Sequence, residues 1–131
     1  STVQIATLVR KTEPGEDIFN PNHVKVVVDA SGNALYFSRA AIPYIRGTDA
    51  SRWSYDHVYY KHLGLYAYTT EVLGLITVMK RSLLESAESL EQNRWIENGI
   101  KIRTAVTEHE SISIDTPEDL ERAIRHLDEN V

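Results

Sequence analysis

Apolar and polar positions alternate along the first residues of the chain, which predicts a strand with one buried face. The alternation covers residues 3–9. A connection holding both proline and glycine follows in residues 11–23. Residues 24–28 are rich in β-branched side chains, a Ser-Gly-Asn turn follows them, and residues 34–37 are apolar again. This order predicts a β-hairpin close to the first strand.

The middle of the chain lacks a clear period and then becomes regular again. Residues 43–61 predict a long irregular loop, and loops of this length are often functional. Residues 62–68 are apolar and aromatic and predict a buried strand. Residues 69–78 predict a helix that Thr69 or Thr70 would cap.

The last third of the chain predicts two more helices with a strand between them. Residues 83–97 show apolar positions at helical spacing, and Asn98-Gly99 has the composition of a helix end. Residues 100–106 alternate like a strand. The segment Asp115-Thr116-Pro117-Glu118-Asp119 is a strong helix start, with Thr116 as the cap. Strands and helices therefore mix along the chain, which predicts an α/β fold that is part of a three-layer open sheet.

Length and composition are compatible with one soluble core. The chain has 131 residues, of which 42% are hydrophobic and 25% charged, and it has no cysteine. Disulfides, thiolate nucleophiles and cysteine-bound zinc are therefore excluded, and a reducing cytoplasm is expected. No apolar run is long enough to span a bilayer. We expect neither a membrane nor a nucleic acid as partner, since the net charge is −5.

The charge is distributed unevenly. Residues 1–84 carry 9 basic and 7 acidic side chains, whereas residues 85–131 carry 5 basic and 12 acidic side chains. A basic part beside an acidic part suits an anionic ligand bound through a metal ion, and two differently solvated surfaces are the alternative. The chain has no glycine-rich phosphate loop, no Gly-x-Ser-x-Gly elbow and no histidine pair at zinc spacing. Any activity must therefore come from scattered polar groups or from groups outside this chain.

Several segments, in order, resemble one enzyme family. They are Phe19-Asn20-Pro21-Asn22 followed by Val24-Lys25-Val26-Val27, Ala34-Leu35-Tyr36-Phe37-Ser38-Arg39 followed by Ile42-Pro43, His62-Leu63-Gly64-Leu65-Tyr66-Ala67-Tyr68, Ser89-Leu90-Glu91-Gln92, Val106-Thr107-Glu108, and Asp115-Thr116-Pro117-Glu118-Asp119-Leu120. Together they resemble the 3-deoxy-manno-octulosonate cytidylyltransferases, or CMP-Kdo synthetases, over essentially the whole chain.

The resemblance implies a Rossmann-like α/β/α nucleotidyltransferase of the nucleotide-diphospho-sugar transferase type. Its reaction joins CTP and Kdo to give CMP-Kdo and pyrophosphate with Mg²⁺, for lipopolysaccharide synthesis, and the family is commonly dimeric. The amino-terminal half of the family carries a Gly/Arg/Lys-rich CTP loop and an aspartate after a Gln-Gly pair, and neither is in this sequence. Residues 1–131 therefore look like a single partial domain, the carboxy-terminal half that binds sugar and self-associates. The abrupt start at Ser1 suggests truncation or processing, and we expect the isolated chain to be inactive.

The resemblance also implies site residues. Asp115 would be one of two aspartates that bind Mg²⁺, and thus catalytic, whereas its spacing alone would make it an aid to the helix cap. Arg39 and Arg46 would lie near the substrates, whose carboxylate and phosphates suit guanidinium groups, with two surface arginines as the alternative.

The sugar pocket would take four more residues from the family pattern. His62 and Tyr66 lie four apart on a predicted strand and hence on one face, where a core tyrosine and a capping histidine are the alternative. Glu91 and Gln92 would contact sugar hydroxyls, or else lie on a solvated helix face. We expect Glu91 to be partly buried, because it borders Leu84 and Trp95 on the predicted helix.

Two other readings remain open from the sequence. The first is a related CMP-sugar synthetase with another acidic sugar, such as sialic acid. The second is a non-catalytic module whose main role is self-association, because a half sheet leaves an edge strand that needs cover.

Overall fold

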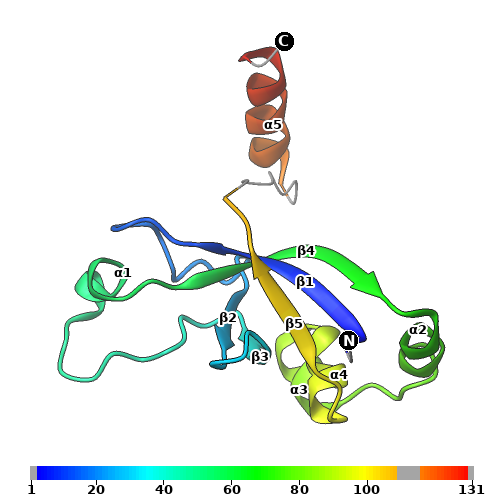
Figure 1. The fold of residues 1–131 in the computed structure, drawn as a ribbon. Coiled ribbons are helices and arrows are strands. Elements are labelled where there is room, and N and C mark those ends of the chain that lie inside the picture. Colours follow the sequence, from blue (N-terminus) through cyan, green and yellow to red (C-terminus); the bar gives the residue numbers. More distant parts are fainter. Residues whose placement is uncertain (1–2, 109–115, 130–131) are drawn as a thin grey trace.

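The computed structural model describes residues 3–108 and 116–129. Within these residues the chain forms one mixed five-stranded sheet in the order β3-β2-β4-β1-β5 (Figure 1). The strands are β1 (Ile5–Lys11), β2 (Lys25–Val28), β3 (Ala34–Ser38), β4 (Tyr60–Tyr68) and β5 (Ile102–Val106). β1 and β5 are parallel, and the other paired strands are antiparallel. The predicted α/β class and the predicted hairpin are confirmed.

Short helices lie between the strands, and a longer helix follows the last strand. They are a 3₁₀ turn η1 (Ala50–Arg52), α1 (Trp53–Asp56), α2 (Thr70–Ile76), α3 (Leu83–Glu88), α4 (Gln92–Glu97) and α5 (Pro117–Glu129). Thr69 caps α2, since its side chain accepts a hydrogen bond from the Val72 amide at 3.2 Å. At α5 the Thr116 hydroxyl accepts from the Asp119 amide at 3.1 Å. Both predicted caps are therefore confirmed, and the chain from 40 to 59 is largely irregular, as expected.

The single helix predicted over residues 83–97 is wrong. Ser89 has a left-handed backbone with φ of 55°, which ends α3, and α4 begins three residues later. Left-handed geometry costs a non-glycine residue free energy, so local contacts must hold it. A capping box between Ser82 and Glu85 fixes the start of α3, which is where the predicted helix also begins. The interruption leaves Leu83 exposed, and the apolar stripe expected on one long helix does not form.

The main core lies between the sheet and the helices. It is built from Ile5, Val9, Val26, Ala34, Phe37, Val72, Ile76, Leu90, Trp95, Ile100 and Ile102. A second, smaller cluster of Ile18, Trp53 and Tyr59 supports the irregular loop. The tip of the hairpin also reaches β5, where the Thr104 amide donates to the Gly32 carbonyl at 2.8 Å.

An irregularity in β4 sets the orientation of its side chains. The register with β1 shifts between Thr7, which faces Tyr66, and Leu8, which faces Leu63. Two extra residues of β4 fit into this bulge, so the alternation of faces is preserved on either side of it. The Thr7 hydroxyl fills the bulge and donates to the Leu65 carbonyl at 2.8 Å. The predicted common face of His62 and Tyr66 therefore survives the bulge.

None of the helices in the described part of the chain has the length and apolar character needed to cross a lipid bilayer.

Candidate functional site

An aromatic group on β4 forms one wall of the candidate site. The rings of His62 and Tyr66 lie 5.4 Å apart, and Tyr66 packs edge-on against Trp95 of α4 at 5.4 Å. His62 also contacts the Phe37 ring at 4.8 Å. The pair predicted from sequence is thus together on one face, packed on the core and half-buried.

Burial keeps His62 neutral. Loss of solvent lowers the pKa of His62 from 6.5 to about 4. Its Nε2 lies 2.9 Å from the Thr7 hydroxyl, which also bonds the carbonyls of Leu65 at 2.8 Å and Leu63 at 3.3 Å. Because both carbonyls can only accept and the hydroxyl has one proton, the arrangement favours the tautomer protonated at Nε2. In that tautomer Nδ1 is the nitrogen that can accept a hydrogen bond from a ligand.

Glu91 and Gln92 lie where α4 begins. Gln92 is buried, whereas Glu91 is exposed, so the expectation that Glu91 is partly buried is wrong. Removal from solvent raises the pKa of Tyr66 and of Tyr68, and the negative charge of Glu91 adds to both shifts. The Glu91 carboxylate is therefore near enough to this aromatic group for its charge to act on both phenols, and its exposed side chain is accessible to a ligand.

The two predicted arginines differ in their surroundings. The Arg39 guanidinium donates to the backbone carbonyls of Pro21, Glu88 and Ser89 at 2.9, 2.7 and 3.2 Å. It thus lies beside the turn that leads to Glu91. Arg46 lies exposed in the irregular loop. The structure brings Arg39, His62, Tyr66, Glu91 and Gln92 into one region, and it does not place Arg46 against them.

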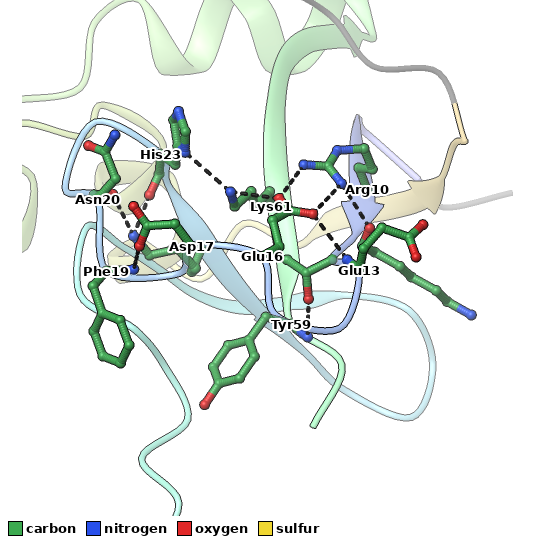
Figure 2. Close-up of polar contacts among 12 residues, drawn as sticks. Arg10, Glu13, Glu16, Asp17, Phe19, Asn20, His23, Tyr59 and Lys61 are labelled. Atoms are coloured by element: carbon green, nitrogen blue, oxygen red, sulfur yellow. Dashed lines mark hydrogen bonds and ion pairs between the residues drawn. The ribbon is translucent and has the colours of Figure 1, made fainter. Parts of the chain in front are cut away.

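A network of charged groups joins the loop before β2 to β1 and β4 (Figure 2). Glu16 accepts from Arg10 at 2.6 and 3.0 Å and lies 2.7 Å from Nζ of Lys61. These cations outweigh the effect of burial and lower the pKa of Glu16 to about 2, the bond from Arg10 being the largest cause. Nζ of Lys61 also lies 3.2 Å from Nδ1 of His23. The network fixes the start of β4 directly before His62.

Lys25 is a fully buried cation at the other side of this loop. Its Nζ donates to the carbonyls of Asn20, His23 and Arg39 at 2.9, 2.5 and 2.7 Å. Burial lowers the pKa of Lys25 to about 8. The ammonium ties the loop that ends at His23 to the exit of β3, and so holds the backbone of Arg39 in place.

The predicted metal ligand Asp115 lies outside the described residues. Among the described residues, no three His, Asp or Glu side chains gather closely enough to hold a metal ion. The Mg²⁺ prediction at Asp115 stays a prediction.

Sequence reasoning missed three groups that shape the site. Thr7 looked like an ordinary strand position, and Asn93 looked like a surface position of a long helix. Glu88 gave no signal beyond its charge.

The sheet with its hairpin and helices has a nucleotidyltransferase fold, as comparison with a solved structure shows. The chain matches a solved structure of CMP:2-keto-3-deoxy-manno-octonic acid synthetase complexed with CTP, with a TM-score of 0.86 and 37% sequence identity. The match covers 99% of this chain and 51% of that one. A sequence profile of the cytidylyltransferase family matches residues 1–102, and the chain belongs to this family.

Relatives in two bacteria are more similar in sequence. The 3-deoxy-manno-octulosonate cytidylyltransferase of Parabacteroides distasonis is 52% identical over 131 residues, which cover 97% of this chain and 52% of the relative. That of Cytophaga hutchinsonii is 54% identical over 121 residues, which cover 92% of this chain and 48% of the relative. The chain thus spans about half the length of these relatives.

Proposed function

We propose that this chain is the sugar-binding part of an enzyme that transfers CMP from CTP to the anomeric hydroxyl of Kdo. The products are CMP-Kdo, which feeds lipopolysaccharide synthesis, and pyrophosphate. The observation that carries the proposal is the His62–Tyr66 pair, packed against Trp95 of the helix that begins at Gln92, in a chain of the cytidylyltransferase family. The names of the relatives support Kdo as the sugar.

The residues of this chain would bind and orient the sugar. Neutral His62 accepts a hydroxyl hydrogen bond at Nδ1, while the exposed Glu91 carboxylate accepts from further hydroxyls. Gln92 offers both a donor and an acceptor, and the phenol of Tyr66 stays protonated and can donate. Arg39 and Arg46 supply positive charge for the sugar carboxylate and the phosphates of CTP. Orientation of this kind aligns the anomeric oxygen with the α-phosphate.

We also propose Asp115 as a ligand of Mg²⁺. Magnesium takes one or two carboxylates from a protein and its remaining ligands from phosphate and water, and when bound it would neutralise charge on the phosphates of CTP. A homodimer in the cytoplasm completes the proposal, and the isolated chain is expected to lack CMP transfer activity.

Titration calorimetry with the purified chain tests the proposal. We expect heat of binding with Kdo, weaker binding of sialic acid, and a clear loss of Kdo affinity in Glu91→Gln. Glu71 is an exposed glutamate of α2 away from the site, so Glu71→Gln is the matched control and should bind like the wild type. Equal affinity of the wild type and Glu91→Gln for Kdo would contradict the placement of the sugar, and tighter binding of sialic acid would favour that sugar.

A further inference from the structure

The open edge of β3 is paired with side chains rather than with another strand. The amide of buried Asn93 donates to the Phe37 carbonyl at 3.0 Å through Nδ2, and its Oδ1 accepts from the Phe37 amide at 3.4 Å. Asn93 therefore satisfies both backbone groups of an edge residue, as a neighbouring strand would. The relative exposure of Asn93 is 0%, so water does not reach its side chain.

The next two residues after Phe37, Ser38 and Arg39, are bound by Glu88. Its Oε1 accepts from the Ser38 hydroxyl at 2.7 Å and from the Arg39 amide at 2.8 Å. The Arg39 guanidinium donates back to the Glu88 carbonyl at 2.7 Å. Burial alone would raise the pKa of Glu88, but the hydrogen bonds lower it, so the carboxylate is ionised and these bonds are charge-assisted.

The two anchors enclose the turn that carries Glu91 and Gln92. Between Glu88 and Asn93 lie four residues, of which Ser89 is left-handed and Leu90 is buried in the core. A turn this short, attached at both ends, has little freedom to move away from the aromatic wall on β4. The backbone conformation of Ser89 is one that the contacts around it must maintain.

We propose that Glu88 and Asn93 are positioning residues, which hold the turn of residues 89–92 on the edge of β3 so that Glu91 and Gln92 face the sugar. This inference rests on the proposed function. Neither residue needs to touch the substrate. Each acts through the placement of its neighbour, Asn93 by pairing with Phe37 and Glu88 by pairing with the exit of β3.

Even substitutions of Glu88 and Asn93 that preserve side-chain size should weaken Kdo binding, because each changes the hydrogen-bonding groups or the charge at its position. Glu88→Gln keeps one acceptor oxygen for the donors of Ser38 and Arg39, but it loses the charge and puts an N–H₂ group in place of the second carboxylate oxygen. Asn93→Asp keeps the acceptor for the Phe37 amide, but it loses the donor and turns an oxygen toward the Phe37 carbonyl. Both changes preserve side-chain size, so cavity effects are small.

A double-mutant cycle in the purified chain tests the inference. Kdo affinity is measured by calorimetry for wild type, Glu88→Gln, Glu91→Gln and the double variant, and thermal unfolding confirms that each folds. If Glu88 acts through Glu91, Glu88→Gln weakens binding about 10-fold in the wild-type background and less than about 2-fold in the Glu91→Gln background. Asn93→Asp serves as the second variant should Glu88→Gln fail to fold. Glu97→Gln is the control, because Glu97 bonds the Leu84 amide and not β3.

Backbone amide exchange supplies a readout without ligand. We expect the amides of residues 89–92 to exchange faster in Glu88→Gln and Asn93→Asp, with β1 and β4 unchanged. Unaltered Kdo affinity in both variants, or an equal loss in both backgrounds of the cycle, would overturn the inference. Absence of Kdo binding by the wild-type chain would instead defeat the proposed function, and that result is seen before any variant is made.

Discussion

The Thr7 hydroxyl and Nε2 of His62 lie 2.9 Å apart across β1 and β4, and the same hydroxyl bonds the Leu65 carbonyl at 2.8 Å inside the β4 bulge. Burial disfavours the positive charge that a second proton would give His62, so its ring stays neutral.

The first prediction concerns acid stability. The pKa of His62 is lowered to about 4 in the folded chain. Between pH 6.5 and 4, His62 is therefore protonated in the unfolded chain and neutral in the folded chain. The free energy of unfolding should therefore fall as the pH falls through this window, by roughly 2–3 kcal/mol. Urea unfolding at a series of pH values measures it. His62→Gln should flatten the dependence between pH 6.5 and 5, and an unchanged slope would refute the prediction.

The second prediction concerns Glu16. Glu16→Gln removes the partner of Arg10 and leaves the buried ammonium of Lys61 without its carboxylate, which should lower the free energy of unfolding by about 3 kcal/mol at neutral pH. Because the pKa of Glu16 is about 2 when folded, this contribution is present above pH 4.5 and is lost as the pH falls toward 2. Glu13→Gln changes an exposed neighbour and should have little effect on chemical denaturation. Equal stability of the two variants would show that the network is not stabilising.

The third prediction concerns Lys25. Lys25→Met keeps an unbranched side chain but removes the ammonium donor from three carbonyl oxygens, of which that of Asn20 keeps the His23 amide as a second donor. We expect a loss of about 2–4 kcal/mol in unfolding free energy, since each unpaired acceptor costs about 1–3 kcal/mol and the relief of a buried charge offsets part of it. Lys11→Met, at an exposed position of β1, is the matched control. A Lys25→Met chain as stable as this control would mean that the carbonyls are solvated.

The fourth prediction separates binding from stability at Glu91. Its side chain is exposed, so Glu91→Gln should change the melting temperature by less than about 2 °C, because surface substitutions stay within about 0.5 kcal/mol. The same change should weaken Kdo binding about 10-fold through the loss of a charge-assisted hydrogen bond. Differential scanning calorimetry and binding titrations on one preparation compare the two effects. A large drop in melting temperature would place Glu91 among the structural groups.

The sequence predicted correctly those elements that are determined by residues close to one another along the chain. The hairpin, the cap of α2 and the start of α5 depend on neighbours in sequence, and the structure confirms them. The break at Ser89 could not be read in this way, because a left-handed serine has no clear signature in the sequence and its carbonyl is bound by Arg39, 50 residues away. The same holds for the exposure of Glu91, which follows from that break.

Only part of the candidate site was predictable from the sequence, namely the residues whose placement follows from local periodicity. His62 and Tyr66 share a face because strand periodicity is local, and the bulge happens to preserve it. The supporting residues Thr7, Glu88 and Asn93 were not predictable, since each acts through a bond to a residue about 50 positions away. Arg46 and Asp115 remain predictions, because the structure does not place the first against the site and Asp115 lies outside the described residues.

The most direct test of the central claim is an NMR titration of the isotopically labelled chain with Kdo. The account predicts that the largest shift changes fall on His62, Tyr66, Glu91 and Gln92, and that the Nδ1 signal of His62 changes while its Nε2 stays protonated. Changes confined to other surfaces, or no change at saturating Kdo, would contradict the claim that this chain carries the sugar site.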